Sequence, residues 1–288
     1  MRQAHNTTEQ LMKAMGAFII GDKAKTRNFI KRIKSPLKGD NQIFYTLLLA
    51  ETEEDPEQQI KYLQELEQKL SPGFAPQRLA QIFYQKGMYQ EAENYAIRSF
   101  YLNEYDINTL EILIDCYFKL CEWEKLTFIT SKFNRINRTK FEPIKNKLAY
   151  YYTLAAQNML DEKDIKKAIY YLEIALTIVP SYYEALRLYL TLNYSSKQNL
   201  DIQMLKDAFI ANPTFEIVEL YHRFFPMPPL KIYEDLATLV DPEHHLGLFL
   251  AIAAYLDLPD KVQCLKHSPD LISFEPKTLP TIIEDRTL

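Results

Sequence analysis

Apolar residues recur every three to four positions along most of the chain, in runs separated by short polar or glycine- and proline-containing breaks. In residues 79–100, "LAQIFYQKGMYQEAENYAIRSF", two such runs flank a single Gly87. This spacing predicts amphipathic helices, and a lone glycine between two runs predicts a tight turn between them. The strict alternation of a β-strand is absent from the sequence. We therefore predict an all-α protein.

The helix–turn–helix pattern repeats. Residues 113–133, "LIDCYFKLCEWEKLTFITSKF", place Cys121 34 residues after Gly87. A third copy spans 149–180, and upstream a similar pattern is centred on Gly21, 66 residues before Gly87. Each later copy ends with an alanine that is followed five residues later by a proline. These pairs are Ala175 and Pro180, Ala208 and Pro213, and Ala237 and Pro242. A repeat of this length predicts stacked pairs of helices.

The register of the repeat predicts three regions. Residues 8–70 form degenerate N-terminal helix pairs, and residues 73–266 form a solenoid. The register slips by eight residues through 134–143, which predicts an insertion made of a loop and extra length on the next helix. The proline-containing tail, 267–288, could cap the solenoid, lie along its groove, or be disordered.

The composition is that of a soluble globular protein, with 47% apolar and 25% charged residues. The net charge of −4 gives no basic field, so we expect no nucleic-acid partner. The longest apolar run, 246–256, is too short for a membrane span, which needs about 20 residues. The three cysteines suit reduced structural thiols better than a disulfide framework.

The repeat resembles the tetratricopeptide consensus, on the spacing of Ala80, Phe83, Gly87, Tyr89 and Ala92. That resemblance implies a right-handed superhelical solenoid of antiparallel helix pairs, whose first helices line a concave groove. Mapping by repeat position, we expect the groove to present Gln81, Tyr84, Gln85, Asp115, Phe118, Lys119, Gln157, Asn193 and Tyr194. Aromatic and amide side chains suit a peptide or helix from a protein partner. Alternatively, these aromatic rings pack against the insertion or the tail.

A narrower resemblance lies in residues 212–255 and in 11–29, "LMKAMGAFIIGDKAKTRNF". Both are similar to the HemY family, proteobacterial tetratricopeptide proteins associated with late haem biosynthesis. The resemblance implies two membrane-spanning helices upstream. The chain as supplied would then be the soluble part of a protein anchored in the inner membrane, with this domain on the cytoplasmic side. A soluble adaptor without any anchor is the alternative.

A basic stripe follows the turn at Gly21. Lys23, Arg27, Lys31 and Lys34 fall on one helical face. Beside a membrane anchor, this stripe would lie close to anionic headgroups, each cation contributing about 1 kcal/mol. The alternative is an ordinary solvated face.

The sequence offers little catalytic chemistry. It contains no nucleophile elbow, phosphate-binding loop or dinucleotide glycine motif, so we predict no enzyme, no metal and no cofactor. His244 and His245 are adjacent and point about 100° apart on a helix. His222 could in principle meet haem iron but suits a plain helix end. We predict a non-catalytic scaffold with Tyr84, Phe118 and Tyr194 as anchors; the alternative is direct porphyrin or haem binding. The sequence does not fix the oligomeric state.

Overall fold

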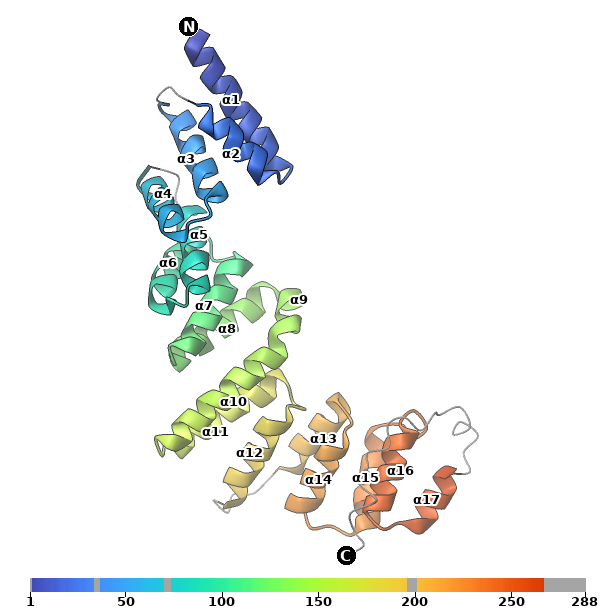
Figure 1. The fold of residues 1–288 in the computed structure, drawn as a ribbon. Helices are drawn as coiled ribbons and strands as arrows, with labels where there is room; N and C mark the ends of the chain where they lie inside the picture. The colour runs from blue at the N-terminus through green and yellow to red at the C-terminus, as the bar shows by residue number, and fades with distance from the viewer. Residues whose placement is uncertain (1, 34–36, 70–73, 196–200, 267–288) are drawn as a thin grey trace, which may run out of the picture. The chain divides into compact units, whose positions relative to one another are not determined.

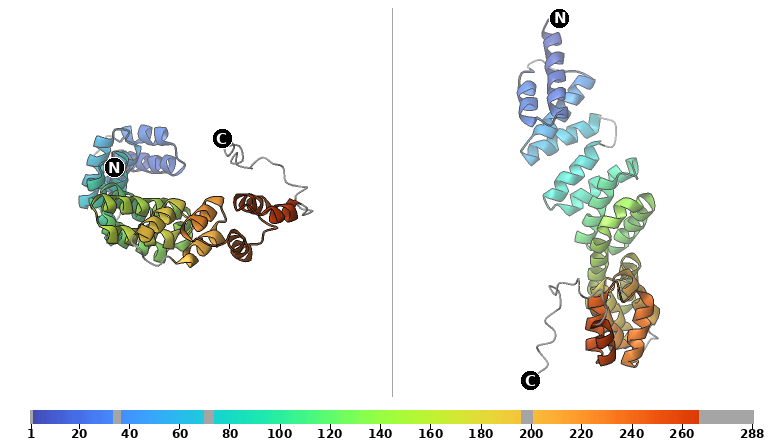
Figure 2. Two further views of the ribbon diagram at one scale, coloured as in Figure 1. Left: turned by 90° about the horizontal axis from the view of Figure 1, so that it is seen from below. Right: turned by 90° about the vertical axis from the view of Figure 1, so that its right-hand side faces the viewer.

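The computed structural model describes residues 2–33, 37–69, 74–195 and 201–266, with residues 2–6, 68, 69 and 74 as backbone only (Figures 1 and 2). Every regular element in these ranges is a helix, which confirms the all-α prediction. The predicted tail and Lys34 lie outside the described residues. The helices are α1 (Arg2–Ile19), α2 (Lys23–Lys31), α3 (Asp40–Thr52), α4 (Pro56–Lys69), α5 (Phe74–Gln85), α6 (Tyr89–Leu102), α7 (Ile107–Lys119), α8 (Trp123–Ile136), α9 (Arg138–Phe141), η1 (Glu142–Ile144), α10 (Lys145–Asp161), α11 (Ile165–Ile178), α12 (Tyr183–Ser195), α13 (Ile202–Ala211), α14 (Phe215–Phe224), α15 (Pro229–Leu239), α16 (Leu246–Tyr255) and α17 (Pro259–Lys266).

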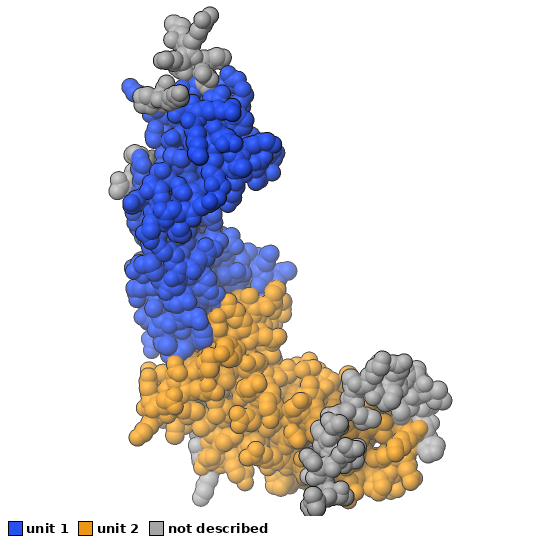
Figure 3. All heavy atoms as spheres, viewed as in Figure 1, with its two compact units in different colours: residues 1–141 blue, residues 142–288 orange. Residues whose placement is uncertain are grey.

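The chain divides into two compact units, residues 1–141 and 142–288 (Figure 3). The division falls inside the segment 134–143 that the sequence marks as an insertion. This segment is helical rather than a loop: the Asn137 side chain accepts a hydrogen bond from the Lys140 backbone N–H at 2.9 Å and starts α9. Phe141 then packs edge-on against Phe133 of α8. The next α-helix, α10, has 17 residues against 13 for α7.

Unit 1 is built from helix pairs in chain order, α1 with α2, α3 with α4, α5 with α6, and α7 with α8. The first helices of neighbouring pairs also touch, α1 against α3 and α5 against α7. Apolar side chains at helical spacing fill the space between the pairs, because each helix buries one face and leaves the other to solvent. Two apolar clusters among the described residues belong to this core. Their buried members include Leu11, Ala14, Ile30 and Leu48 in one, and Leu63, Leu79, Phe83, Ala92 and Cys116 in the other.

Unit 2 continues the same construction. The helix α10 packs along α11, and the first helices α10, α12, α14 and α16 touch one another in sequence. Its largest fully buried side chains are Tyr152, Phe209, Tyr221 and Phe249. Small residues at the closest crossings, among them Ala156 and Ala168, are also fully buried. Helix pairs of this kind are the tetratricopeptide-like architecture that the repeat predicts.

One turn geometry ends several first helices in both units. A residue with positive φ follows the helix at Gly21, Gly87, Cys121, Lys163 and Asp257. In each case the next N–H reaches back to a carbonyl five residues earlier, as from Met88 to Phe83 at 2.9 Å. This is the Schellman arrangement, in which a left-handed residue satisfies the last carbonyls of a helix. Cys121, with a φ of +57°, therefore takes the same left-handed position that Gly87 takes in the previous repeat.

Candidate functional site: a groove on the first helices of unit 1

The first helices of unit 1 leave an open groove of about 330 Å³. Its lining comes from three of them: Phe18 of α1, Leu47 and Glu51 of α3, and Gln77, Arg78 and Gln81 of α5. Gln81 is one of the residues that the sequence predicts for a groove. The groove therefore combines apolar walls with a charged and amide-lined side.

An ion pair forms the polar side of the groove. Arg78 Nε donates to Glu51 Oε1 at 2.9 Å, and its Nη2 donates to Glu51 Oε2 at 3.2 Å. The remaining Nη1 donates to the amide oxygen of Gln81. A two-point guanidinium–carboxylate contact fixes both planes, so it holds α5 against α3 and sets the position of the Gln81 amide. Both ionic side chains are largely buried, with 30% and 13% of their surface exposed.

The predicted residues Tyr84 and Asp115 join α5 to α7. The Tyr84 hydroxyl donates to Asp115 Oδ2 at 3.0 Å, and the Tyr84 ring lies edge-on to Tyr89. Burial, and then the negative charge of Asp115, raise the pKa of Tyr84 to about 12. At neutral pH this tyrosine is therefore a neutral donor that ties two helices together. Two turns earlier on α5, the Gln77 side chain donates to Asp106, the N-cap residue of α7, at 2.8 Å.

Phe118 and Lys119 stand at the end of α7. The Phe118 ring is half-buried and meets Trp123 edge-on, with ring centroids 6.1 Å apart. The exposed Lys119 ammonium lies 5.5 Å from the centre of the Phe118 ring, a cation–π contact. Gln85, at the end of α5, is exposed. All three side chains can reach solvent beside the Tyr84–Asp115 pair.

Unit 2 contains the remaining residues predicted for a groove. Gln157 is exposed on α10. Tyr194, on α12, is 61% exposed and lies edge-on to Phe224 of α14, with ring centroids 5.7 Å apart. Asn193 departs from the expectation: it is 4% exposed, and its amide donates to the Tyr189 carbonyl four residues earlier. The Asn193 amide is thus used within its own helix and is not presented to a partner.

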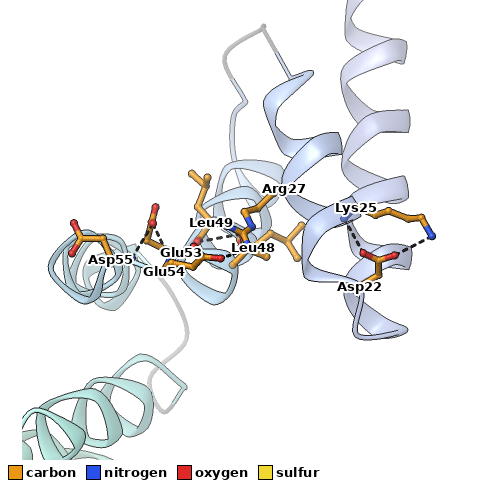
Figure 4. Close-up of polar contacts among 9 residues, drawn as sticks. Asp22, Lys25, Arg27, Leu48, Leu49, Glu53, Glu54 and Asp55 are labelled. Carbon is orange, nitrogen blue, oxygen red and sulfur yellow. Dashed lines mark hydrogen bonds and ion pairs between the residues drawn. The ribbon is translucent and has the colours of Figure 1, made fainter.

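The predicted basic stripe is only partly available. Lys23 and Lys31 are exposed on α2, but Arg27 turns toward the end of α3 and pairs with Glu54 at 2.5 Å (Figure 4). Arg27 also draws the pKa of Glu54 below its usual value through this hydrogen bond. At the start of α2, Asp22 accepts from the Lys25 backbone N–H and pairs with the Lys25 side chain (Figure 4). Arg27 is therefore a tie between helix pairs and not a free cation.

The sequence did not reveal Phe18, Leu47, Glu51, Gln77 and Arg78 as groove residues. One signal could have found two of them: Gln77 and Arg78 precede Gln81 by four and three residues, so they share its helix face. Phe18, Leu47 and Glu51 belong to the degenerate N-terminal pairs, where the repeat register is too weak to map positions.

Among the described cysteines and histidines, Cys116 is buried, and His222 and His244 contact other side chains. Burial, and then Asp115, raise the pKa of the Cys116 thiol to about 12, which leaves it an unreactive core residue. His222 Nδ1 lies 3.3 Å from the Tyr255 hydroxyl, and His244 contacts Asp241 at 2.7 Å. Among the described residues, no three His, Cys, Asp or Glu side chains come close enough to share a metal ion.

The helices in the described part of the chain include none that combines the length and the apolar character needed to cross a bilayer. This finding concerns the described ranges alone.

Helix pairs joined by a shared left-handed turn, with an open groove on their first helices, define a helix-repeat protein of the tetratricopeptide type. This architecture is typical of scaffolds that bind other proteins, and it is typically non-catalytic.

The chain belongs to the same family as the uncharacterized protein RP472 of Rickettsia prowazekii (strain Madrid E). The two are 34% identical over 259 residues, which cover 89% of this chain and 77% of RP472. The sequence matches no model of a known protein family. The structure is also similar to that of a tetratricopeptide repeat protein from Parabacteroides merdae ATCC 43184, at a TM-score of 0.41 and 9% identity, over 91% of this chain and 99% of the other.

Proposed function

We propose that this protein is a non-catalytic scaffold that binds an extended or helical segment of a protein partner in the groove of α1, α3 and α5. One observation carries the proposal: the groove pairs the apolar side chains Phe18 and Leu47 with a fixed polar row, Glu51, Arg78 and Gln81.

The groove suits a peptide better than a small metabolite. It is open to solvent, and its polar lining residues come from α3 and α5, whereas α1 contributes the apolar Phe18. An apolar side chain of the partner fits between Phe18 and Leu47, while the amide groups of Gln77 and Gln81 suit the backbone of an extended segment. Because Glu51 already fixes the position of Arg78, these polar side chains lose little conformational entropy when a partner binds.

The binding surface extends along α5 toward α7. Tyr84 and Phe118 are the predicted anchors there, one fixed by Asp115 and the other resting on Trp123. Aromatic rings that are held in place lose little freedom when a partner covers them, which favours them as anchors. In unit 2, Tyr194 against Phe224 offers a separate aromatic anchor of the same kind.

A peptide library displayed on phage tests the proposal. Selection on the wild-type chain should enrich peptides that Gln81→Trp fails to bind, because the indole fills the groove. Asn94→Trp is the matched control, since Asn94 is an exposed amide residue on α6 outside the groove lining. Peptides that bind wild type and both variants alike would place the binding surface elsewhere, and a library that yields no binder would remove the scaffold proposal.

The resemblance to HemY extends this proposal. By that resemblance the full-length protein is anchored in the inner membrane, carries this domain on the cytoplasmic side, and supports haem or porphyrin biosynthesis by assembling proteins. Direct haem or porphyrin binding is the alternative. A shift of the Soret band on mixing haem with the chain, lost in His222→Ala, would support that alternative.

A further inference from the structure

The lining of the groove in unit 1 is apolar at one end and polar but uncharged overall in the middle. Phe18 of α1 and Leu47 of α3 supply the apolar end. In the middle, Arg78 and Glu51 neutralise each other through their two-point contact, and the third lining group, the Gln81 amide, carries no charge. The described lining therefore offers a partner an apolar site and hydrogen-bonding groups, but no uncompensated charge.

The next first helix, α7, continues this surface beyond α5. Two side-chain contacts hold the two helices together: Gln77 donates to Asp106 at 2.8 Å, and Tyr84 donates to Asp115 at 3.0 Å. The contacts join residues 29 and 31 positions apart, so α7 runs alongside α5 over the whole stretch from Gln77 to Tyr84. The face of α7 that carries Asp115 is thus the face that adjoins the groove helix.

Glu111 lies on α7 between these two contacts. It precedes Asp115 by four residues, so the two carboxylates share one helix face. Gln81 lies between the same two contacts on α5, which places Glu111 across from this groove residue. Glu111 is exposed, and within the described ranges its side chain forms no ion pair or hydrogen bond. Its negative charge is therefore available to a partner.

The surroundings of Glu111 add negative charge rather than cancel it. Burial, and then the charge of Asp115, raise the pKa of the neighbouring Cys116 thiol to about 12. Lys119, one turn beyond Asp115, directs its ammonium over the Phe118 ring, 5.5 Å from the ring centre. The surface thus runs from an apolar end at α1 and α3 to an acidic end at α7.

We propose that the partner segment carries a lysine or arginine that pairs with Glu111 while an apolar residue of the same segment occupies the site at Phe18 and Leu47. This rests on the function proposed above for the groove, and it names the chemistry of the partner. Packed helices lie about 8–10 Å apart, so α3 and α7, with α5 between them, are about 20 Å apart. An extended chain covers that distance in about six residues. The partner is an extended segment with a basic residue about six positions from an apolar anchor.

Peptides selected on phage against the wild-type chain test this chemistry. Those that Gln81→Trp rejects should be enriched in Lys or Arg at that spacing from an apolar residue. Glu111→Gln should weaken binding of a fluorescein-labelled selected peptide about threefold, and Glu111→Lys about tenfold, as measured by fluorescence anisotropy. Glu124→Gln is the matched control, because Glu124 is an exposed carboxylate on the second helix α8, outside the groove lining. It should bind like wild type.

Exchanging the charges tests the pairing itself. A peptide with glutamate in place of its basic residue should lose affinity for wild type and recover it for Glu111→Lys. Peptides that Gln81→Trp rejects, but that lack a basic residue and bind Glu111→Gln as tightly as wild type, would overturn this pairing and leave the groove as the binding site. Peptides that bind Gln81→Trp like wild type would overturn both the pairing and the function proposed for the groove.

Discussion

The substitution Gly87→Ala tests how much the left-handed residue at the end of a first helix contributes to the stability of the fold. Gly87 has a φ of +75°, and a Cβ built there meets no atom within 4 Å. The substitution therefore adds no steric contact, and its cost comes from the backbone conformation alone. A side chain in the left-handed region costs about 1–2 kcal/mol, and the loss of unfolded-state freedom returns about 0.4–1 kcal/mol. We expect the free energy of unfolding to fall by about 1 kcal/mol.

Gly16→Ala supplies the matched control. The same substitution is made in the same unit, and the new Cβ again meets nothing within 4 Å, but Gly16 lies inside α1. In a helix interior alanine is favoured over glycine by about 1 kcal/mol, so this variant should become more stable. The two substitutions should thus differ in sign.

Urea denaturation followed by tryptophan fluorescence measures both effects. The chain has a single tryptophan, Trp123, which is buried in unit 1 and reports on that unit alone. Equal shifts of the urea midpoint for the two variants would refute the reasoning from backbone conformation.

Three further predictions follow from individual contacts. Lys163→Gly, at an exposed residue with a φ of +64°, should stabilise unit 2 by about 0.5–1 kcal/mol, seen as a higher urea midpoint by circular dichroism. Lys125→Ala removes the ammonium 2.9 Å from the buried Glu93 carboxylate and should destabilise unit 1 by about 1–2 kcal/mol; an unchanged urea midpoint would mean that Gln90 alone satisfies Glu93. The raised pKa of Tyr84 means that the unfolded chain loses this proton near pH 10 and the folded chain near pH 12, so stability falls as pH rises through that window. Tyr84→Phe should show a shallower fall over the same pH range than wild type does, and an identical profile would exclude Tyr84 as a source.

The fold could be predicted because its determinants are local. Helical periodicity, the small residues at crossings and the turn residue recur at a fixed period, and each is visible in the sequence around Gly87 and again around Cys121. The turn between α3 and α4 lacks that signature: Glu53 ends α3 in an extended conformation. The register is lost there, which is why Leu47 and Glu51 were not mapped to the groove.

The rest of the candidate site depends on contacts between residues far apart in the chain. The Arg78–Glu51 and Arg27–Glu54 pairs each join residues 27 positions apart, and only packing of successive helix pairs brings them together. Helix-face mapping from the sequence could select Gln81 and Tyr84 but could not say which cations are already paired. Asn193 shows a second limit of mapping by repeat position. Its amide donates a hydrogen bond to a carbonyl of its own helix, and the repeat position alone does not reveal this.

The measurement that tests the central claim most directly is photocrosslinking of a selected peptide to the chain. Benzoylphenylalanine at the exposed position 85, one turn along α5 from Gln81, should crosslink the peptide without filling the groove. The same crosslinker at position 94, exposed on α6, should give no product. Crosslinking at position 85 but not at position 94 would support a partner bound along α5 at the groove; crosslinking at position 94 instead would contradict the groove as the binding site.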